Sequence, residues 1–237
     1  MLGVVVNTVG VIIGSIFGLL FKKGIPEKIS DSLQVILGFA TAYVGISGAL
    51  EGKNVLITIL SLVVGAVLGT LIDIDKRLND LGGFVERKFN RGTGNVSLAQ
   101  GFVTASLLFC VGSMTIVGSL QAGISGNNEM LFTKSLLDFV MSIVLTSTLG
   151  IGVMLSALFV LVFQGGIALL SGFVAPYLGD AVIAEMTCTG SILVIAIGMN
   201  LAGISKVKVA NYLPAVFAPI LICPLYNMVS ELLTGLF

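Results

Sequence analysis

The sequence predicts an all-α, polytopic membrane protein with about eight transmembrane helices, some of them discontinuous, arranged as an inverted repeat. Of its 237 residues, 56% are hydrophobic and only 10% are charged, which is too little charge to cover the surface of a soluble domain. The mean hydropathy is +1.11. The 30 glycines fit the close packing of helices in lipid. The lipid bilayer is therefore the first expected partner of the chain.

Eight apolar runs approach the length of about 20 residues that a helix needs to cross the hydrocarbon core. They are 2–21, 29–50, 55–72, 101–124, two runs within 130–171, 181–204 and 209–237. We divide the block 130–171 at Gly150-Ile151-Gly152, and the choice between two full crossings and a re-entrant pair stays open. The chain is then one transmembrane domain, 1–237, with three crossings in 1–72 and five in 98–237.

The segment 73–97 joins the two groups of crossings. It carries Leu78, Leu81, Val85 and Phe89 on one helical stripe, opposite charged residues. This pattern predicts an amphipathic helix at the cytoplasmic surface. A solvated linker with accidental periodicity is the alternative.

The basic residues predict the orientation of the chain. Placing the N-terminus outside puts ten of the twelve Lys and Arg residues in cytoplasmic loops, and only Lys53 and Lys134 fall elsewhere. With eight crossings the C-terminus is also expected outside.

Two short internal matches predict the inverted repeat. The string at 12–15 resembles the one at 116–119, and the string at 45–47 matches the one at 203–205. The predicted topology gives the two members of each match opposite directions, as in many secondary transporters. Such short matches also arise by chance in apolar sequence, and this alternative stays open.

Small and hydroxylated residues interrupt the fourth crossing. Backbone groups freed by a helix break at this depth must be satisfied by protein, water or a ligand. We assign these residues to a solute-binding site: Gly112, Ser113, Met114, Thr115, Gly118, Ser119 and Gln121. A kinked helix whose Ser and Thr bond their own carbonyls is the alternative.

Three charged residues lie inside or just within apolar runs. Lys134 and Asp138 are four residues apart and share a helical face, so an ion pair can lower the cost of about 2.5–3.5 kcal/mol per central charge. Lys134 can instead extend to the outer surface. Glu185 is followed by hydroxylated residues suited to holding a cation. We assign Asp138, Glu185 and Lys134 to ion coupling, with interfacial placement as the alternative.

The last crossing contains prolines at 214, 219 and 224, which predict a kinked or discontinuous element. We add the nearby Asn200 and Asn211 to the solute site. Gln164 lines the same cavity or bonds a neighbouring helix, and Asn7 is explained equally well by interfacial solvation.

Glycines spaced four residues apart form faces suited to close helix contact. They are Gly10, Gly14 and Gly18 in the first crossing, and Gly65 and Gly69 in the third. These faces pack within the chain or across a homodimer.

Signatures of enzymes are missing from the sequence. There is no histidine, no phosphate-binding loop, no nucleophile elbow and no paired-cysteine spacing. The formal net charge is zero. We therefore expect neither catalysis nor a metal, cofactor or nucleic-acid partner.

Several strings resemble an uncharacterised bacterial membrane family, domain of unknown function 554, the YqgA-like proteins. They are the run 109–119, the run 134–138, Gln164-Gly165 and the run 211–215, where Tyr212 replaces a leucine that is usual in the family. The resemblance spans essentially the whole chain and implies a location in the bacterial inner membrane. It implies no substrate.

The leading functional hypothesis is a secondary transporter of a small polar solute, an amino acid or a carboxylate, coupled to H⁺ or Na⁺. One alternative is an ion channel, for which the polar residues would line a continuous pore. The other is a membrane scaffold or sensor without transport, whose polar residues only hold helices together.

Overall fold

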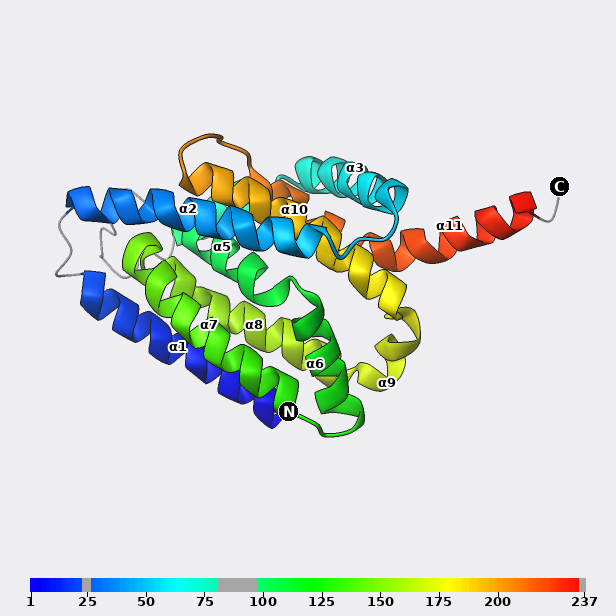
Figure 1. Ribbon diagram of the computed structural model, residues 1–237, viewed down its shortest axis with the longest axis horizontal. Helices are drawn as coiled ribbons and strands as arrows, with labels where there is room; N and C mark the ends of the chain where they lie inside the picture. Colours follow the sequence, from blue (N-terminus) through cyan, green and yellow to red (C-terminus); the bar gives the residue numbers. More distant parts are fainter. Residues whose placement is uncertain (23–26, 81–97, 235–237) are drawn as a thin grey trace.

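The computed structural model describes residues 1–22, 27–80 and 98–234, and within them every regular element is helical (Figure 1). The crossings are formed by α1 (Leu2–Lys22), α2 (Glu27–Ala49), α3 (Val55–Ile72), α5 (Leu98–Cys110), α6 (Ser113–Ile124), α7 (Glu129–Leu149), α8 (Gly152–Leu169), α10 (Asp180–Leu201), the 3-10 helix η2 (Val209–Val216) and α11 (Pro219–Thr234). Between α8 and α10 lie two short elements, α9 (Ser171–Val174) and η1 (Ala175–Tyr177).

The all-α polytopic fold class is confirmed. Six of the described helices are long and apolar enough to cross a membrane, and two bent pairs raise the number to eight. The pairs are α5 with α6, bent by 65°, and η2 with α11, bent by 50°. The expected division of the block 130–171 is also present, because the chain leaves α7 after Leu149 and starts α8 at Gly152, with Gly150 at φ 77°.

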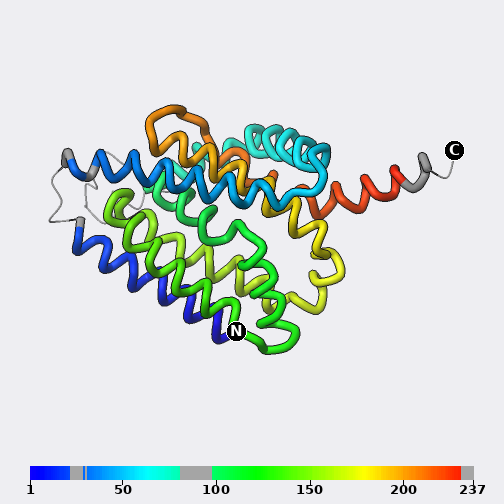
Figure 2. Tube along the Cα trace, in the orientation of Figure 1, coloured from blue at the N-terminus to red at the C-terminus, as the bar shows by residue number. Residues whose placement is uncertain are grey.

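Contacts at glycines give the relative directions of the helices. α1 runs parallel to α7, because Gly3 lies against Leu131 and Gly18 against Thr146. α5 and α6 run parallel to α8, since Gly123 near the end of α6 lies against Ala168 near the end of α8. Figure 2 shows the resulting path of the chain.

The remaining pairs are antiparallel. Gly38 of α2 lies against Ala202 just after α10, and Gly52 just after α2 lies against Cys188 within α10. Gly69, near the end of α3, packs against Asn211 at the start of η2. All these directions are the ones that eight alternating crossings require. The side of the membrane on which each end lies stays a prediction.

The glycine faces of α1 and α3 are covered within one chain. A Cβ atom added at Gly14 would lie 2.5 Å from the backbone oxygen of Phe139 in α7. A Cβ atom at Gly65 would collide with Ala215 in η2. These glycines therefore bring α1 against α7 and α3 against η2 within one chain, and the expected homodimer stays an untested prediction.

The protein interior is formed mainly by α5, α7, α8, α10 and η2. Phe109, Leu145, Val153 and Leu193 belong to its largest buried apolar cluster. α10 is the most buried of the described crossings, whereas α2 and α3 expose most of their apolar residues. Exposed apolar side chains are the expected covering of helices that face lipid.

Two predictions, the amphipathic linker and the inverted repeat, are tested only in part or not at all. Residues 74–80 are helical, and Ile74 and Leu78 pack against the largest apolar cluster. The rest of the predicted amphipathic linker, 81–97, lies outside the described residues. The inverted repeat stays a prediction, although α1 and α6, which carry its first match, run in opposite directions.

Candidate functional site

The fourth crossing breaks at Gly112, as the sequence predicts. Gly112 has φ 135° and ψ 145°, a conformation that is essentially restricted to glycine. A Cβ atom added there would meet no atom within 4 Å, so the backbone conformation, not space, requires glycine. Across the break, the Thr115 hydroxyl donates to the carbonyl oxygen of Phe109 at 3.0 Å. Thr115 thus satisfies one carbonyl that the break frees.

The other predicted residues of this segment have different surroundings. Gly118 packs against Met130 and Leu131 of α7. The hydroxyl of Ser119 is buried and has no hydrogen-bond partner among the described residues. Ser113 and Gln121 are half-buried, and Met114 is exposed. Of the predicted set, Thr115, Gly118 and Ser119 face the interior.

Next to this break lies a cluster of four buried polar side chains from three helices, which we call the central polar cluster: Asn7 of α1, Lys134 and Asp138 of α7, and Gln164 of α8. The Lys134 Nζ atom is ion-paired with Asp138 Oδ1. Asn7 donates through Nδ2 to Asp138 Oδ2 at 3.0 Å and to Gln164 Oε1 at 3.1 Å. Asn7 and Gln164 are 0% exposed, Asp138 3% and Lys134 8%.

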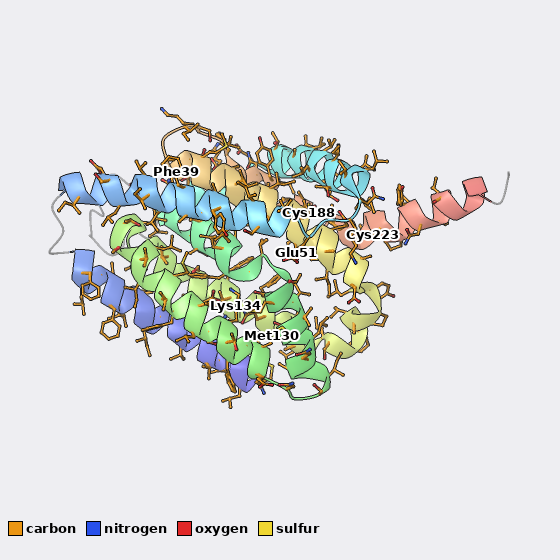
Figure 3. All side chains as sticks on the ribbon, viewed as in Figure 1. Phe39, Glu51, Met130, Lys134, Cys188 and Cys223 are labelled. Carbon is orange, nitrogen blue, oxygen red and sulfur yellow. The ribbon has the colours of Figure 1, made fainter. Side chains whose placement is uncertain are left out.

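The central polar cluster lies near the middle of the crossings. Asp138 is nine residues into α7, and at about 1.5 Å per residue this places it about 14 Å from the start of the helix, roughly half the hydrocarbon thickness. The Lys134 Nζ atom lies 5.9 Å from the centroid of the Phe109 ring, in the last turn before the break. Figure 3 labels Lys134, whose side chain is buried. The charges and the break therefore adjoin each other.

Lys134 turns inward to Asp138 and does not extend to the surface. The pairing lowers the cost of burying either charge, because each offsets the field of the other in a medium of low dielectric constant. The amide of Asn7 satisfies the second carboxylate oxygen. The cluster as a whole carries one positive and one negative charge.

Glu185 of α10 has a different set of partners. Its Oε1 atom accepts hydrogen bonds from the backbone nitrogens of Lys53 and Asn54, both at 2.7 Å, and Oε2 accepts one from the Thr58 hydroxyl at 2.9 Å. Asn54 is the N-cap of α3. A carboxylate at a helix N-terminus is favoured by the helix dipole. Glu185 thus fastens the start of α3 to α10 and is not part of the central polar cluster.

Comparison with known proteins identifies the family. The model of the family described as "Protein of unknown function (DUF554)" matches residues 2–224. The chain belongs to this family. It is 37% identical over 223 residues to the "Uncharacterized membrane protein YdfK" of Bacillus subtilis (strain 168), covering 92% of this chain and 94% of the relative. It is 27% identical over 217 residues to the "Uncharacterized protein YqgA" of Escherichia coli (strain K12), covering 90% and 92%. No solved structure matches.

In this DUF554 protein, Asn200 and Asn211 hold backbone segments together at the end of the bundle that carries Lys206. Asn200 Oδ1 accepts hydrogen bonds from the Ser205 hydroxyl at 2.7 Å and from the Val207 nitrogen at 2.9 Å. Asn211 Oδ1 accepts one from the Asp75 nitrogen at 2.7 Å. The structure does not bring either amide to the break at Gly112.

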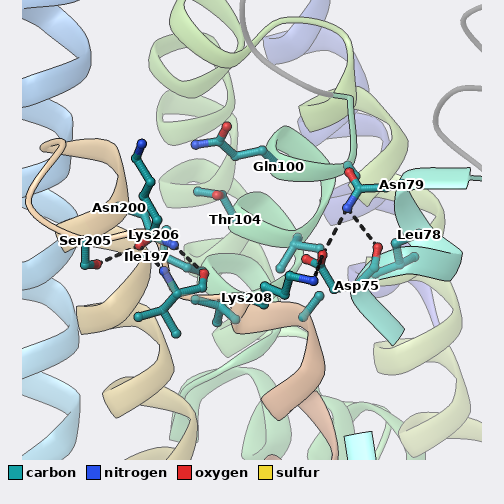
Figure 4. A pocket seen from close by; sticks show the side chains of 15 residues that line it. Asp75, Leu78, Asn79, Gln100, Thr104, Ile197, Asn200, Ser205, Lys206 and Lys208 are labelled. Atoms are coloured by element: carbon teal, nitrogen blue, oxygen red, sulfur yellow. Dashed lines mark hydrogen bonds and ion pairs between the residues drawn. The ribbon is translucent and has the colours of Figure 1, made fainter. Parts of the chain in front are cut away.

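Asn200 also lines a pocket of about 290 Å³ between the start of α5 and the end of α10 (Figure 4). Polar groups surround its mouth, among them Asp75, Gln100, Lys206 and Lys208. This DUF554 chain therefore has a cavity lined by both polar and apolar residues at the end that the sequence predicts to be cytoplasmic. Among the described residues, no group of His, Cys, Asp and Glu side chains could hold a metal ion.

Two members of the central polar cluster were weaker predictions from the sequence. From the sequence, interfacial solvation explains Asn7 as well as a site does, but Asn7 lies three residues before Gly10 and seven before Gly14, on the face that packs against α7. This spacing is the feature of the sequence that indicates that Asn7 faces a neighbouring helix. Gln164, which precedes two glycines, accepts a hydrogen bond from Asn7 and so bonds a neighbouring helix, while its Nε2 atom has no partner among the described residues.

Proposed function

We propose that the chain is a secondary transporter that carries a small polar solute, an amino acid or a carboxylate, across the bacterial inner membrane with coupling to H⁺ or Na⁺. The observation that carries this proposal is the central polar cluster. A buried ion pair and two buried amides lie together in apolar helices, beside a broken helix.

Helix association alone gives little reason for such an ion pair. Replacing a buried pair by apolar residues of similar volume is often neutral or stabilising. Charged residues inside membrane helices commonly belong to pathways for solutes, ions or protons. Secondary transporters also place their sites at discontinuous helices near the middle of the bilayer. Here Lys134 and Asp138 supply the charges, and the break at Gly112 supplies a helix N-terminus without a side-chain cap.

The two ends of the bundle differ in a way that supports alternating access. At one end a pocket opens between α5 and α10. At the other end Glu185 fastens the α2–α3 connection to α10. With both termini outside, the open end is the cytoplasmic one. In the proposed carrier, this difference between the ends would belong to a form that is closed on its outer side.

The test measures the transport current of the purified protein in liposomes that are adsorbed to a solid-supported electrode. Pulses of single amino acids and carboxylates are applied under H⁺ or Na⁺ gradients. We expect a saturable current for a subset of solutes, abolished by Asp138→Asn. Glu129→Gln is the matched control, because Glu129 is an exposed carboxylate in the first turn of the same helix.

Three results would speak against the carrier. A current that rises linearly with solute concentration favours a channel. A full current in Asp138→Asn shows that the central polar cluster takes no part in transport. A blank result with every solute, combined with loss of assembly in Asp138→Asn, favours a scaffold.

A further inference from the structure

The central polar cluster contains two hydrogen-bonding groups that the protein leaves unused. Asn7 Oδ1 and Gln164 Nε2 are buried without a partner among the described residues. Their orientations follow from Asp138: its carboxylate requires the NH₂ group of Asn7, and that NH₂ group in turn requires the oxygen of Gln164. One acceptor and one donor therefore stay free beside the ion pair, whereas the other buried side-chain atoms without a partner among the described residues are all Ser or Thr hydroxyls.

We infer that this cluster is the binding site for the zwitterionic end of an α-amino acid, an inference that rests on the proposed transport function. An α-ammonium group offers three donors, which match Asp138 and the free oxygen of Asn7. An α-carboxylate offers acceptors, which match Lys134 and the free NH₂ group of Gln164. The ligand supplies the same two charges that Lys134 and Asp138 supply to each other in this structure.

Charge balance separates the amino acid from the simple carboxylate. The cluster holds one cation and one anion, so a bound zwitterion leaves the buried site neutral. A carboxylate that bound without H⁺ or Na⁺ would pair with Lys134 and leave Asp138 as a buried charge without a cation. An amine alone would pair with Asp138 and leave Lys134 as a buried charge without an anion. Uncompensated charge at this depth is strongly disfavoured.

The spacing of the two charges also fits. Lys134 and Asp138 are one helical turn apart, which places their Cβ atoms about 5–6 Å from each other. This distance allows one side chain to reach each end of an α-amino acid. Lys134 lies beside Phe109, next to the break, and a Cβ atom added at Gly112 would meet no neighbour.

The test is a thermal-shift measurement on the purified full chain with each of the common amino acids. A ligand that binds the folded state raises the unfolding temperature. The amino acid that gives the largest shift is compared with its two analogues that lack either the amino or the carboxylate group. We expect each analogue to bind about 10- to 100-fold more weakly, the loss expected for one charged hydrogen bond.

Two variants test whether the central polar cluster is where the amino acid binds. Lys134→Met with Asp138→Asn removes both charges together, so no charge is left unpaired, and we expect it to abolish the shift. Gln164→Leu removes the free donor together with the oxygen that accepts from Asn7, leaves the ion pair intact, and is expected to weaken binding about 10-fold. Glu129→Gln should bind like the natural protein.

The outcomes separate this inference from the proposed function. Equal binding of the carboxylate analogue, or no binding of any amino acid, overturns the zwitterion site, and the solute currents in liposomes then decide transport by themselves. Binding that requires both ends of the amino acid, without any current, keeps the site and overturns the transporter.

Discussion

The closest helix contact that glycine permits in α1 gives a quantitative test of the fold. A Cβ atom at Gly14 would lie 2.5 Å from the backbone oxygen of Phe139 and closer still to the Ser142 hydroxyl. At Gly10, four residues earlier on the same face, the nearest atom is the Ser135 backbone oxygen at 3.4 Å. Gly14→Ala and Gly10→Ala are therefore chemically identical changes on one face with different clearance.

The magnitude follows from the clearance. Non-bonded heavy atoms rest about 3.5 Å apart, so Gly14→Ala requires α1 and α7 to separate by about 1 Å. The Ser142 hydroxyl can rotate away, but the backbone oxygen of Phe139 cannot. Overpacking of this kind costs about 1–3 kcal/mol. Both variants gain the same helix propensity, about 1 kcal/mol, so the difference between them isolates the collision.

The assay uses the three cysteines, which are free and buried and therefore react with a thiol dye only on unfolding. We expect Gly14→Ala to unfold at lower temperature than Gly10→Ala, and Gly10→Ala to match or exceed the natural protein. Equal stability of the two variants would show that α1 and α7 are not packed as described.

Two further predictions concern the ends of the bundle. Glu185→Ala removes the acceptor of the Lys53 and Asn54 backbone hydrogen bonds, so we expect faster hydrogen exchange in 53–58, whereas Glu185→Gln retains a neutral acceptor and should lose only about 1 kcal/mol of local protection. Unchanged exchange in Glu185→Ala would refute the fastening role. A cysteine placed at Glu129 should react with a membrane-impermeant maleimide in intact cells, whereas one placed at Lys206 should react only after the membrane is opened. The reverse labelling pattern would show that the orientation of the chain in the membrane is opposite to the predicted one.

The features that the sequence predicted well depend on short stretches of chain. The crossings follow from local hydropathy, so their expected limits lie within a few residues of the helices. The break at Gly112 follows from a glycine beside hydroxylated residues inside an apolar run. The contact between Lys134 and Asp138 follows from helical periodicity alone. None of these predictions requires knowledge of which helices touch.

The features that could not be predicted from the sequence depend on which helices pack against each other. Asn7 joins Asp138 only because α1 packs against α7, and Gln164 joins them only because α8 lies on the other side. The partners of Glu185 are mostly backbone nitrogens, which no side-chain pattern reveals. The sequence therefore predicted Glu185 as a partner in ion coupling, whereas its contacts are those of a helix cap.

The ion pair of the central polar cluster has a consequence for a carrier that must return empty. With Lys134 and Asp138 bonded to each other, the empty site carries no net charge. With a zwitterion between them, the loaded site is again neutral. A site that held only one charged group would carry a net charge through the apolar interior, at a cost of at least about 2.5–3.5 kcal/mol. In the proposed carrier, the internal ion pair would therefore take the place of the solute, and the empty and zwitterion-loaded forms would change conformation at similar electrostatic cost.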